Sequence, residues 1–302
     1  MFNIKSTSEV REMSNQSIGM LIREFRQSRN LTMKEVCDND LSIAQLSKFE
    51  RGVSEITINK LLMILDKLNI TVEEFFHAEK EFELSEFEQL ILDMKEHYIN
   101  RDVDKILALR DGQSRKYEER NIKFFELNAI MLSALIKDLD EDQYDWEDRE
   151  PKLIDHLMEV DIWCNYEIVL FANSISLFTV EALVMLTNEM INNTQYYHVI
   201  GKHRTITIQT LTNVILILLE KGETFHSKMF HDTLEELLEI DQYMLYEKNV
   251  SKYLNGFHHF STGEEARGIQ LMEESIQTFD ILDRKQLADN FRAHLNNLQM
   301  QK

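Results

Sequence analysis

Hydrophobic residues recur every three or four positions along nearly the whole chain, which is the spacing of amphipathic helices. After residue 83 this pattern continues to the end of the chain. One proline and eight glycines in 302 residues leave few turn-forming positions, so we expect an all-α fold. Before residue 80 the pattern predicts five short helices, carried by Ile18–Phe25, Leu31–Cys37, Ser42–Gly52, Ile58–Leu68 and Thr71–Phe76.

The segment from Ser42 to Gly52 contains signals for both ends of a helix. Ser42 is a predicted N-cap, and Gln45 three residues later completes a capping box. Gly52 is a natural stop because glycine adopts a positive φ without strain. Thr32 and Glu35 predict the same kind of start for the preceding helix. Two short helices joined by a tight turn make a helix-turn-helix.

One side of the second of these helices carries residues suited to contacting DNA. Ile43, Leu46 and Phe49 repeat every three residues and are expected to face the core. Small, polar and basic side chains lie outside that apolar side near the helix start, which suits insertion into a major groove. These side chains are Ala44, Gln45, Ser47 and Lys48. Besides Lys48, the cations expected at phosphates are Arg23, Lys34 and Arg51.

The same segments resemble the phage-repressor-like, XRE-type helix-turn-helix family. The matching residues are 22–26, 31–32, 46–52 and 70–75. In that family the arginine matching Arg26 pairs with the glutamate matching Glu50, so the resemblance implies a structural role for both. It implies base contacts for a set that comprises Ala44, Gln45 and Lys48. It also implies positions near phosphates for Ser42 and Arg51.

The net charge of −20 arises beyond the helix-turn-helix. Residues 1–70 carry ten Lys and Arg against nine Asp and Glu, whereas the remainder carries 23 against 44. The DNA-contacting part is therefore nearly neutral, and the acidic remainder is expected to weaken non-specific DNA binding. An ordinary solubilising surface is the alternative explanation and accounts for most of the excess.

We expect residues 77–83 to link a DNA-binding domain, residues 1–76, to a helical body, residues 84–302. One body helix is expected to close near Gly112, with a long helix starting at Ser114. Beyond Pro151 the predicted helices form pairs, namely 151–160 with 162–174, 179–193 with 204–221, 225–239 with 241–255, and 264–280 with 284–300. Antiparallel pairs repeating about every 30 to 45 residues are typical of an α-solenoid. A compact helical bundle is the alternative.

One unit is tetratricopeptide-like. Gly256, Gly263 and Gly268 stand where that repeat places small residues for close helix contact. Met272 and Ser275 then match an apolar and a small position. The predicted body is therefore a solenoid of tetratricopeptide-like repeats.

An XRE-type domain followed by a long acidic helical body resembles the Rgg (MutR/GadR-type) regulators of streptococci and relatives. Residues 45–52 and 163–171 carry the local resemblance. It implies a homodimeric, cytoplasmic transcription regulator. It also implies that the repeat body binds a short secreted and re-imported peptide pheromone on its concave face, as in quorum sensing.

A peptide offers backbone N–H and C=O groups, and a carboxamide can bind both at once. Asn173 and Asn213 lie in apolar helical segments, where a carboxamide is costly unless it has a partner or lines a groove. Asn188 and Asn192 are four residues apart and share a helix face. Tyr166 is a further candidate for a pocket wall. The alternatives are exposed surface for the asparagines and core packing for the tyrosine. The expected apolar wall of the groove consists of Phe171, Leu177 and Leu216.

A homodimer is expected because one helix-turn-helix reads few bases, and half-sites about 10 bp apart, or a multiple of that spacing, suit a two-fold dimer. We expect its contacts in residues 264–300, at apolar side chains that exceed what one terminal helix pair can bury. These side chains are Leu271, Ile276, Phe279, Leu287, Phe291, Leu295 and Leu298.

Other classes of function find little support in the sequence. It contains no glycine-rich phosphate loop and no Ser/His/Asp signature, and Cys37 and Cys164 lack metal-ligand spacing. We therefore expect no catalysis, metal or cofactor. No run of about eighteen apolar residues predicts a membrane span, and the two cysteines indicate a reducing cytoplasm. Cys37 is expected to be a small buried residue rather than a redox sensor. The remaining alternatives are a helical-repeat interaction scaffold and a repressor that needs no ligand.

Overall fold

The computed structural model describes residues 18–79, 83–143, 149–194, 201–240 and 243–300, and every regular element in these residues is a helix. The predicted all-α fold is therefore confirmed. The contacts divide the chain into two compact units, Met1–Leu92 and Asp93–Lys302. The division falls within helix α7 (Glu86–Ile99).

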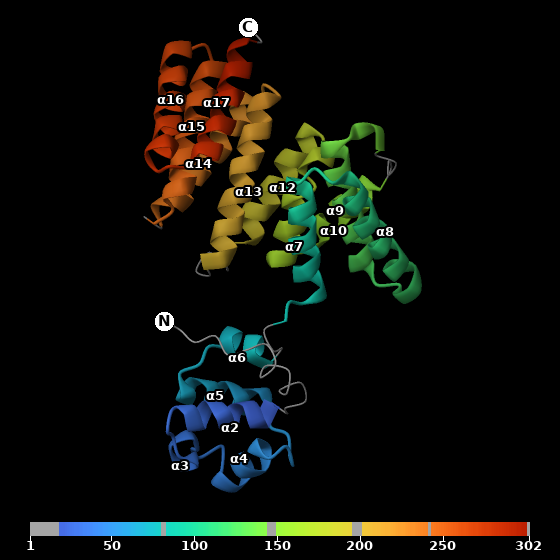
Figure 1. Ribbon diagram of the computed structural model, residues 1–302, viewed down its shortest axis with the longest axis vertical. Helices are drawn as coiled ribbons and strands as arrows, with labels where there is room; N and C mark the ends of the chain where they lie inside the picture. Colours follow the sequence, from blue (N-terminus) through green and yellow to red (C-terminus); the bar gives the residue numbers. More distant parts are fainter. Residues whose placement is uncertain (1–17, 80–82, 144–148, 195–200, 241–242, 301–302) are drawn as a thin grey trace. The chain divides into compact units, whose positions relative to one another are not determined.

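Residues 18–79 form the predicted domain of five helices (Figure 1). Their bounds are α2 (Ile18–Ser28), α3 (Met33–Val36), α4 (Ile43–Glu50), α5 (Ile58–Leu68) and α6 (Val72–Glu79). The inward faces bury one cluster of apolar side chains, in which Ile22, Leu46, Ile64 and Phe75 are fully enclosed. The predicted linker, residues 77–83, begins inside α6, because the helical pattern extends to Glu79.

The predicted ends of α4 are confirmed. The Ser42 hydroxyl accepts the Gln45 backbone N–H at 3.2 Å, and the Ser42 N–H donates to Gln45 Oε1 at 3.3 Å. Gly52 follows with φ 68°. The prediction that Ile43 faces the core is wrong, because this side chain is 49% exposed. Side chains on a helix lean toward its N-terminus, so the first residue of α4 projects beyond the core.

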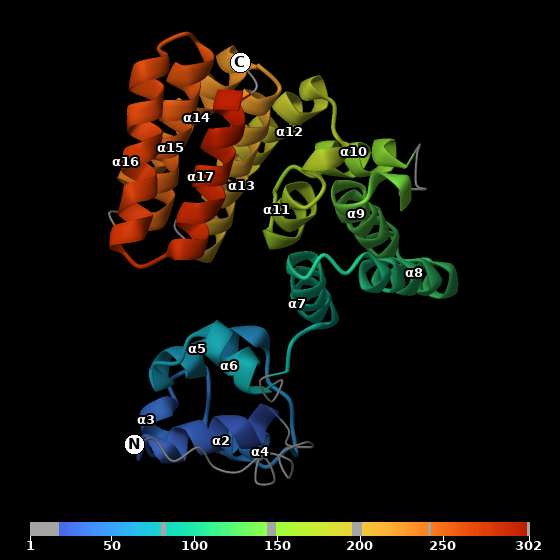
Figure 2. The ribbon, with the colours of Figure 1, turned by 45° about the horizontal axis from the view of Figure 1, so that its top comes forward.

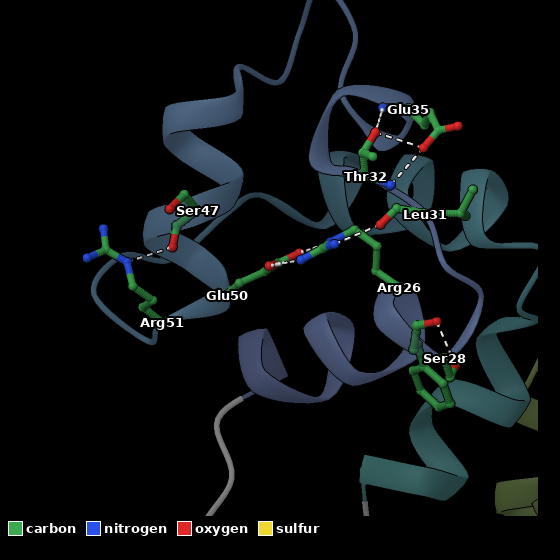
Figure 3. Close-up of polar contacts among 9 residues, drawn as sticks. Arg26, Ser28, Leu31, Thr32, Glu35, Ser47, Glu50 and Arg51 are labelled. Carbon is green, nitrogen blue, oxygen red and sulfur yellow. Dashed lines mark hydrogen bonds and ion pairs between the residues drawn. The ribbon is translucent and has the colours of Figure 1, made fainter.

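A buried ion pair joins α2 to α4. Arg26 Nε and Nη2 each donate to a Glu50 carboxylate oxygen at 2.7 Å, and Nη1 donates to the Leu31 carbonyl at 2.8 Å (Figure 3). Arg26 is 7% exposed and Glu50 is 1% exposed. The hydrogen bonds that Arg26 donates to Glu50 raise the pKa of Arg26 above its ordinary value. The pairing that the family resemblance implied is confirmed.

The C-terminal unit continues α7 with ten further α-helices in the described residues. They are α8 (Val103–Arg120), α9 (Lys123–Leu139), α10 (Glu150–Glu159), α11 (Asn165–Ala172), α12 (Val180–Asn193), α13 (Gly201–Glu220), α14 (Thr224–Glu239), α15 (Leu245–Ser261), α16 (Glu265–Ile281) and α17 (Lys285–Met300). Two short 3₁₀ helices, η2 (Glu141–Gln143) and η3 (Ile175–Leu177), complete the described elements.

The predicted break near Gly112 is wrong, because Gly112 lies inside α8. The chain turns instead at Asn121, which adopts a φ of 50° and caps α8. A glycine within a helix costs only about 1 kcal/mol relative to alanine, so packing can carry the helix through it. Asparagine is the commonest residue after glycine to take the left-handed conformation at a helix end.

The pairing predicted for the helices after Pro151 is confirmed for α12 with α13, α14 with α15 and α16 with α17. It is wrong for α10 and α11, because α10 packs mainly on α12 and α9, and α11 packs mainly on α13 and α9. Each helix packs mainly on helices close to it in the chain, and α14 to α17 lie side by side in both views (Figures 1 and 2). This pattern is that of a solenoid. Gly256 and Gly268 lie at the contact of α15 with α16, where a Cβ on Gly268 would come within 2.6 Å of the Gly256 carbonyl oxygen. Gly263 instead forms the turn between the two helices, with φ 95°.

The expected set of dimer contacts in residues 264–300 is partly wrong. Ile276, Phe279 and Leu295 are 5% exposed or less within a single chain. They pack on their own neighbouring helices, because α16 contacts both α15 and α17. These three side chains are therefore not available to a partner.

Replacing Glu50 by alanine is expected to lower the unfolding free energy of the N-terminal unit by about 3–5 kcal/mol, because the Arg26 guanidinium would stay buried without its counter-charge. The double variant Arg26→Met, Glu50→Leu should lose less, since no charge remains buried. Amide exchange of residues 18–79 in the full chain, across a urea series, measures both. Glu55→Ala, at an exposed position, is the control. Equal losses of unfolding free energy in the single and double variants would show that the change in side-chain volume, rather than the unpaired charge, dominates the effect.

Candidate functional site

The expected DNA-contacting side chains of α4 form an exposed surface. Ala44, Gln45 and Lys48 are exposed, and Ser47 is half-buried. Gln45 Oε1 accepts hydrogen bonds at the helix start, one of them from Lys60 Nζ at 3.4 Å. The Nε2 group of Gln45 has no partner among the described residues, so it is free to donate to a base edge.

Lys60 is a cation of this surface that the sequence pattern did not single out. It lies on α5 and shares a hollow of about 500 Å³ with Gln45 and Lys48. The sequence did contain an indication of a phosphate contact at this position. Lys60 follows the predicted N-cap Thr57 by three residues, and the start of a helix favours anions. Glu55 lines the same hollow, so Lys60 has to offset its negative charge for a phosphate to bind here.

The other predicted phosphate contacts are also exposed. Arg23 lies on α2 and Lys34 on α3, and neither forms an ion pair in the described part of the chain. Arg51 caps α4, and its Nε donates to the Ser47 carbonyl at 3.1 Å (Figure 3). Ser42 is engaged in its own capping box, which leaves its hydroxyl facing solvent at the helix start.

In the C-terminal unit, Asn173 and Asn213 line the same hollow, which we call the carboxamide groove. Its volume is about 290 Å³. The groove is lined by residues of α7, α9, α11, η3 and α13, namely Met94, Lys95, Tyr98, Leu135, Asp138, Ala172, Asn173, Ile175, Ser176, Asn213, Leu216 and Ile217. Met94, Leu135 and Ile175 are each 8% exposed or less and make an apolar floor.

The two carboxamides of the groove keep hydrogen-bonding capacity. Asn173 Nδ2 donates to the Val169 carbonyl at 2.7 Å, which leaves its Oδ1 free to accept. Asn213 is exposed, and its side chain has no partner among the described residues. Of the expected apolar wall, Leu216 lines the groove, whereas Phe171 and Leu177 are 6% exposed or less and belong to the core.

The other three candidates lie outside this groove. Asn188 and Asn192 are exposed on α12, and Asn188 Nδ2 donates to the Val184 carbonyl at 2.9 Å. The Tyr166 hydroxyl lies 3.1 Å from Asn128 Oδ1 and packs edge-on against a phenylalanine. Burial raises the pKa of Tyr166, which agrees with a packing role. The sequence pattern grouped all five candidates, and the fold brings two of them together.

Helix α7 forms a wall of the groove that no sequence pattern predicted. Lys95 is exposed at its rim, and the Tyr98 hydroxyl donates to the Asp138 carboxylate across it. Burial first, and the bond to Asp138 second, raise the pKa of Tyr98 to about 12. No local pattern marks these residues, because the pairing joins helices that are separated by α8.

The described residues contain no cluster of His, Cys, Asp and Glu side chains that could hold a metal ion. None of their helices combines the length and apolar character needed to cross a bilayer. Cys37 is half-buried and packs against the core of its domain, and burial raises the pKa of its thiol. A raised thiol pKa lowers the thiolate fraction, which disfavours redox reactivity.

Each of the two units matches a family model of known proteins. A family model described as the C-terminal domain of the HTH-type transcriptional regulator Rgg matches residues 107–293. A helix-turn-helix family model matches residues 22–75. The first match covers more than half of the chain. The chain belongs to the Rgg family.

Solved structures agree with this assignment. The SHP pheromone receptor Rgg2 of Streptococcus dysgalactiae is 28% identical, with a TM-score of 0.80 over 93% of this chain and 99% of that chain. A proposed transcriptional regulator from Listeria monocytogenes EGD-e is 24% identical, with a TM-score of 0.81 over 94% and 97%. ComR from S. thermophilus, solved with DNA and its signalling peptide ComS, is 15% identical, with a TM-score of 0.60 over 94% and 100%. The last two similarities show the fold alone.

Replacing Gln45 or Lys48 by alanine is expected to weaken binding to a duplex selected from random sequence by the unaltered protein. A bidentate base contact contributes about 1–3 kcal/mol to discrimination, so the loss should be several-fold and confined to the selected duplex. Lys60→Ala should instead weaken all duplexes alike and lower the salt slope by about 0.9. Anisotropy titrations over a salt series test this, with Lys67→Ala as the control. Equal losses on selected and unrelated duplexes for all variants would place sequence reading elsewhere.

Proposed function

We propose that the protein is a sequence-specific DNA-binding transcription regulator of the cytoplasm, controlled by a short peptide pheromone bound in the carboxamide groove. The main support is the meeting of Asn173, at the end of α11, with Asn213 on α13 in one hollow with an apolar floor. Carboxamides bind both donors and acceptors of an extended peptide backbone, and the floor suits an apolar side chain. Rgg2 is an SHP pheromone receptor, and ComR binds both DNA and a signalling peptide.

The size of the groove limits how much of a peptide it takes. Ligand pockets typically measure about 300–1,000 Å³, and this groove is at the lower end at about 290 Å³. It therefore holds one or two side chains with their backbone, while the rest of the peptide continues along the neighbouring helices. The peptide side chain that contacts the apolar floor then determines specificity, and Asn173 and Asn213 hold the peptide backbone in register.

A larger hollow of about 880 Å³ lies in the N-terminal unit, lined by α2, α4 and α5 with the connection between the last two. Its lining includes Ile18, Phe49, Val53 and Ile58 but no carboxamide. A peptide bound there would have few side-chain partners for its backbone. We therefore assign the ligand to the carboxamide groove.

The decisive experiment adds peptide to the protein on its selected duplex. Synthetic peptides from the hydrophobic C-terminal tails of small open reading frames beside the gene are the probes, and one of them should change the DNA affinity. Asn213→Ala and Asn173→Ala are expected to lose that response while keeping DNA affinity without peptide. Asn188→Ala is a matched control, because Asn188 also donates to a carbonyl four residues earlier but lies outside the groove.

Two outcomes would count against this function. A response that persists in Asn213→Ala, with lowered stability, would make Asn213 a structural residue and place the ligand elsewhere. DNA binding that is indifferent to every peptide, together with a stable co-purified protein, would favour an interaction scaffold.

We further propose that the regulator is a homodimer that joins through one end of the last four helices. The end of α14, the start of α15 and the end of α16 expose six large apolar side chains, each at least 46% exposed. They are Ile240, Tyr243, Leu245, Tyr246, Ile281 and Leu282. An identical surface related by a two-fold axis can cover such an exposed apolar group.

Replacing Ile281 and Leu282 by glutamate is expected to weaken the dimer about tenfold or more, because two desolvated charges would oppose their copies at the two-fold axis. Sedimentation equilibrium measures this against a chain mass of 35.9 kDa. Met300→Glu, 82% exposed at the other end of α17, is the control. A monomer at micromolar concentration in the unaltered protein would refute the dimer.

A further inference from the structure

Helix α7 forms one wall of the carboxamide groove and also leads into the N-terminal unit. Met94, Lys95 and Tyr98 line the groove together with Asn173 and Asn213. The division between the two compact units falls after Leu92, within the same helix. A molecule in the groove therefore touches the helix through which the chain continues to the helix-turn-helix.

One hydrogen bond at the rim joins this helix to α9. The Tyr98 hydroxyl donates to the Asp138 carboxylate. Tyr98 is half-buried, and its pKa of about 12 keeps the hydroxyl protonated throughout the neutral range. Asp138 is exposed, so this acceptor can also be solvated by water if the tyrosine leaves. The bond is thus present at neutral pH and can be broken without burying an unpaired charge.

Lys95 gives a ligand direct access to the same helix. It lies three residues before Tyr98, so both side chains project from one face of α7. Lys95 is exposed in the groove and has no ion pair among the described residues. A carboxylate or carbonyl of the ligand can therefore bind Lys95 beside the Tyr98–Asp138 bond.

We propose that the Tyr98–Asp138 hydrogen bond holds α7 against α9, and that a ligand in the carboxamide groove acts on DNA binding by breaking this bond. This inference rests on the proposed function of the groove. A ligand shifts an equilibrium only between arrangements for which its affinity differs. Contacts with Lys95 and Tyr98 supply that difference, because both residues lie on the helix that moves.

The test needs no ligand. Tyr98→Phe removes the hydroxyl and keeps the ring, so in the full chain the amides of residues 86–99 are expected to exchange about fivefold faster or more. The dissociation constant for the selected duplex is expected to change about threefold or more, because the population of the arrangements shifts. Tyr117→Phe is the control, since Tyr117 is half-buried on α8, lies outside the groove and has no side-chain hydrogen bond among the described residues.

Asp138→Ala removes the acceptor of the same bond at an exposed position. It therefore tests the bond even if Tyr98→Phe causes a folding defect. Both single variants and their double variant are expected to have equal effects, which is the pattern of one shared interaction. Faster exchange with unchanged DNA affinity in both single variants would overturn the proposal, as would unchanged exchange. A lost peptide response in Asn213→Ala with no effect of Tyr98→Phe would leave the groove's function intact and remove only this inference.

The bond also has a defined dependence on pH. The pKa of Tyr98 is raised to about 12 in the fold, above its ordinary value of about 10. The stabilisation is therefore complete below the ordinary pKa and is lost as pH rises through the raised one. The difference in alkaline absorbance between the unaltered protein and Tyr98→Phe should show one tyrosine ionising near pH 12. Ionisation at the ordinary pKa would show that neither the burial of Tyr98 nor its bond to Asp138 persists in solution.

Discussion

The buried pair of Arg26 with Glu50 is the interaction on which the DNA-binding unit depends. It fixes the end of α4 against α2 through two charged hydrogen bonds of 2.7 Å. Gly19 permits the close approach, because a Cβ there would lie 1.8 Å from the Phe49 carbonyl oxygen. A bidentate pair sets an orientation as well as a distance. The exposed side of α4, with Gln45 and Lys48, is thereby held at one angle to the rest of its unit.

The C-terminal unit differs in that it places polar groups beside an apolar surface. Stacked helices bury their aliphatic faces, and the carboxamide groove interrupts that packing beside the ends of α9 and α11. Asn173 Nδ2 donates to the Val169 carbonyl, and its Oδ1 remains able to accept a hydrogen bond. Its exposure is therefore inexpensive without ligand, since water can serve the free group.

The sequence was most informative where structure is determined locally. The capping boxes at Thr32 and Ser42 and the stop at Gly52 each depend on residues within a few positions, and all three are present. Asn173 and Asn188 show the limit of such reasoning, because both carboxamides bind a carbonyl four residues earlier, yet only one lines the groove. Tyr98 and Asp138 had no sequence signal at all, since their contact exists only after α7 and α9 have packed.

The energy of one hydrogen bond limits how the groove can act. A bond to a charged group contributes about 1.5–3 kcal/mol, which is roughly a 10- to 150-fold change in an equilibrium. Converting a population from about 1% to 99% needs about 5.5 kcal/mol. Breaking the Tyr98–Asp138 bond is therefore only part of a complete switch, and ligand contacts with α7 must supply the remainder. Under the proposed mechanism, contacts with Asn213 on α13 would hold the ligand equally in both arrangements, so they would contribute affinity but no switching. Affinity and response would then depend on different walls of the same groove.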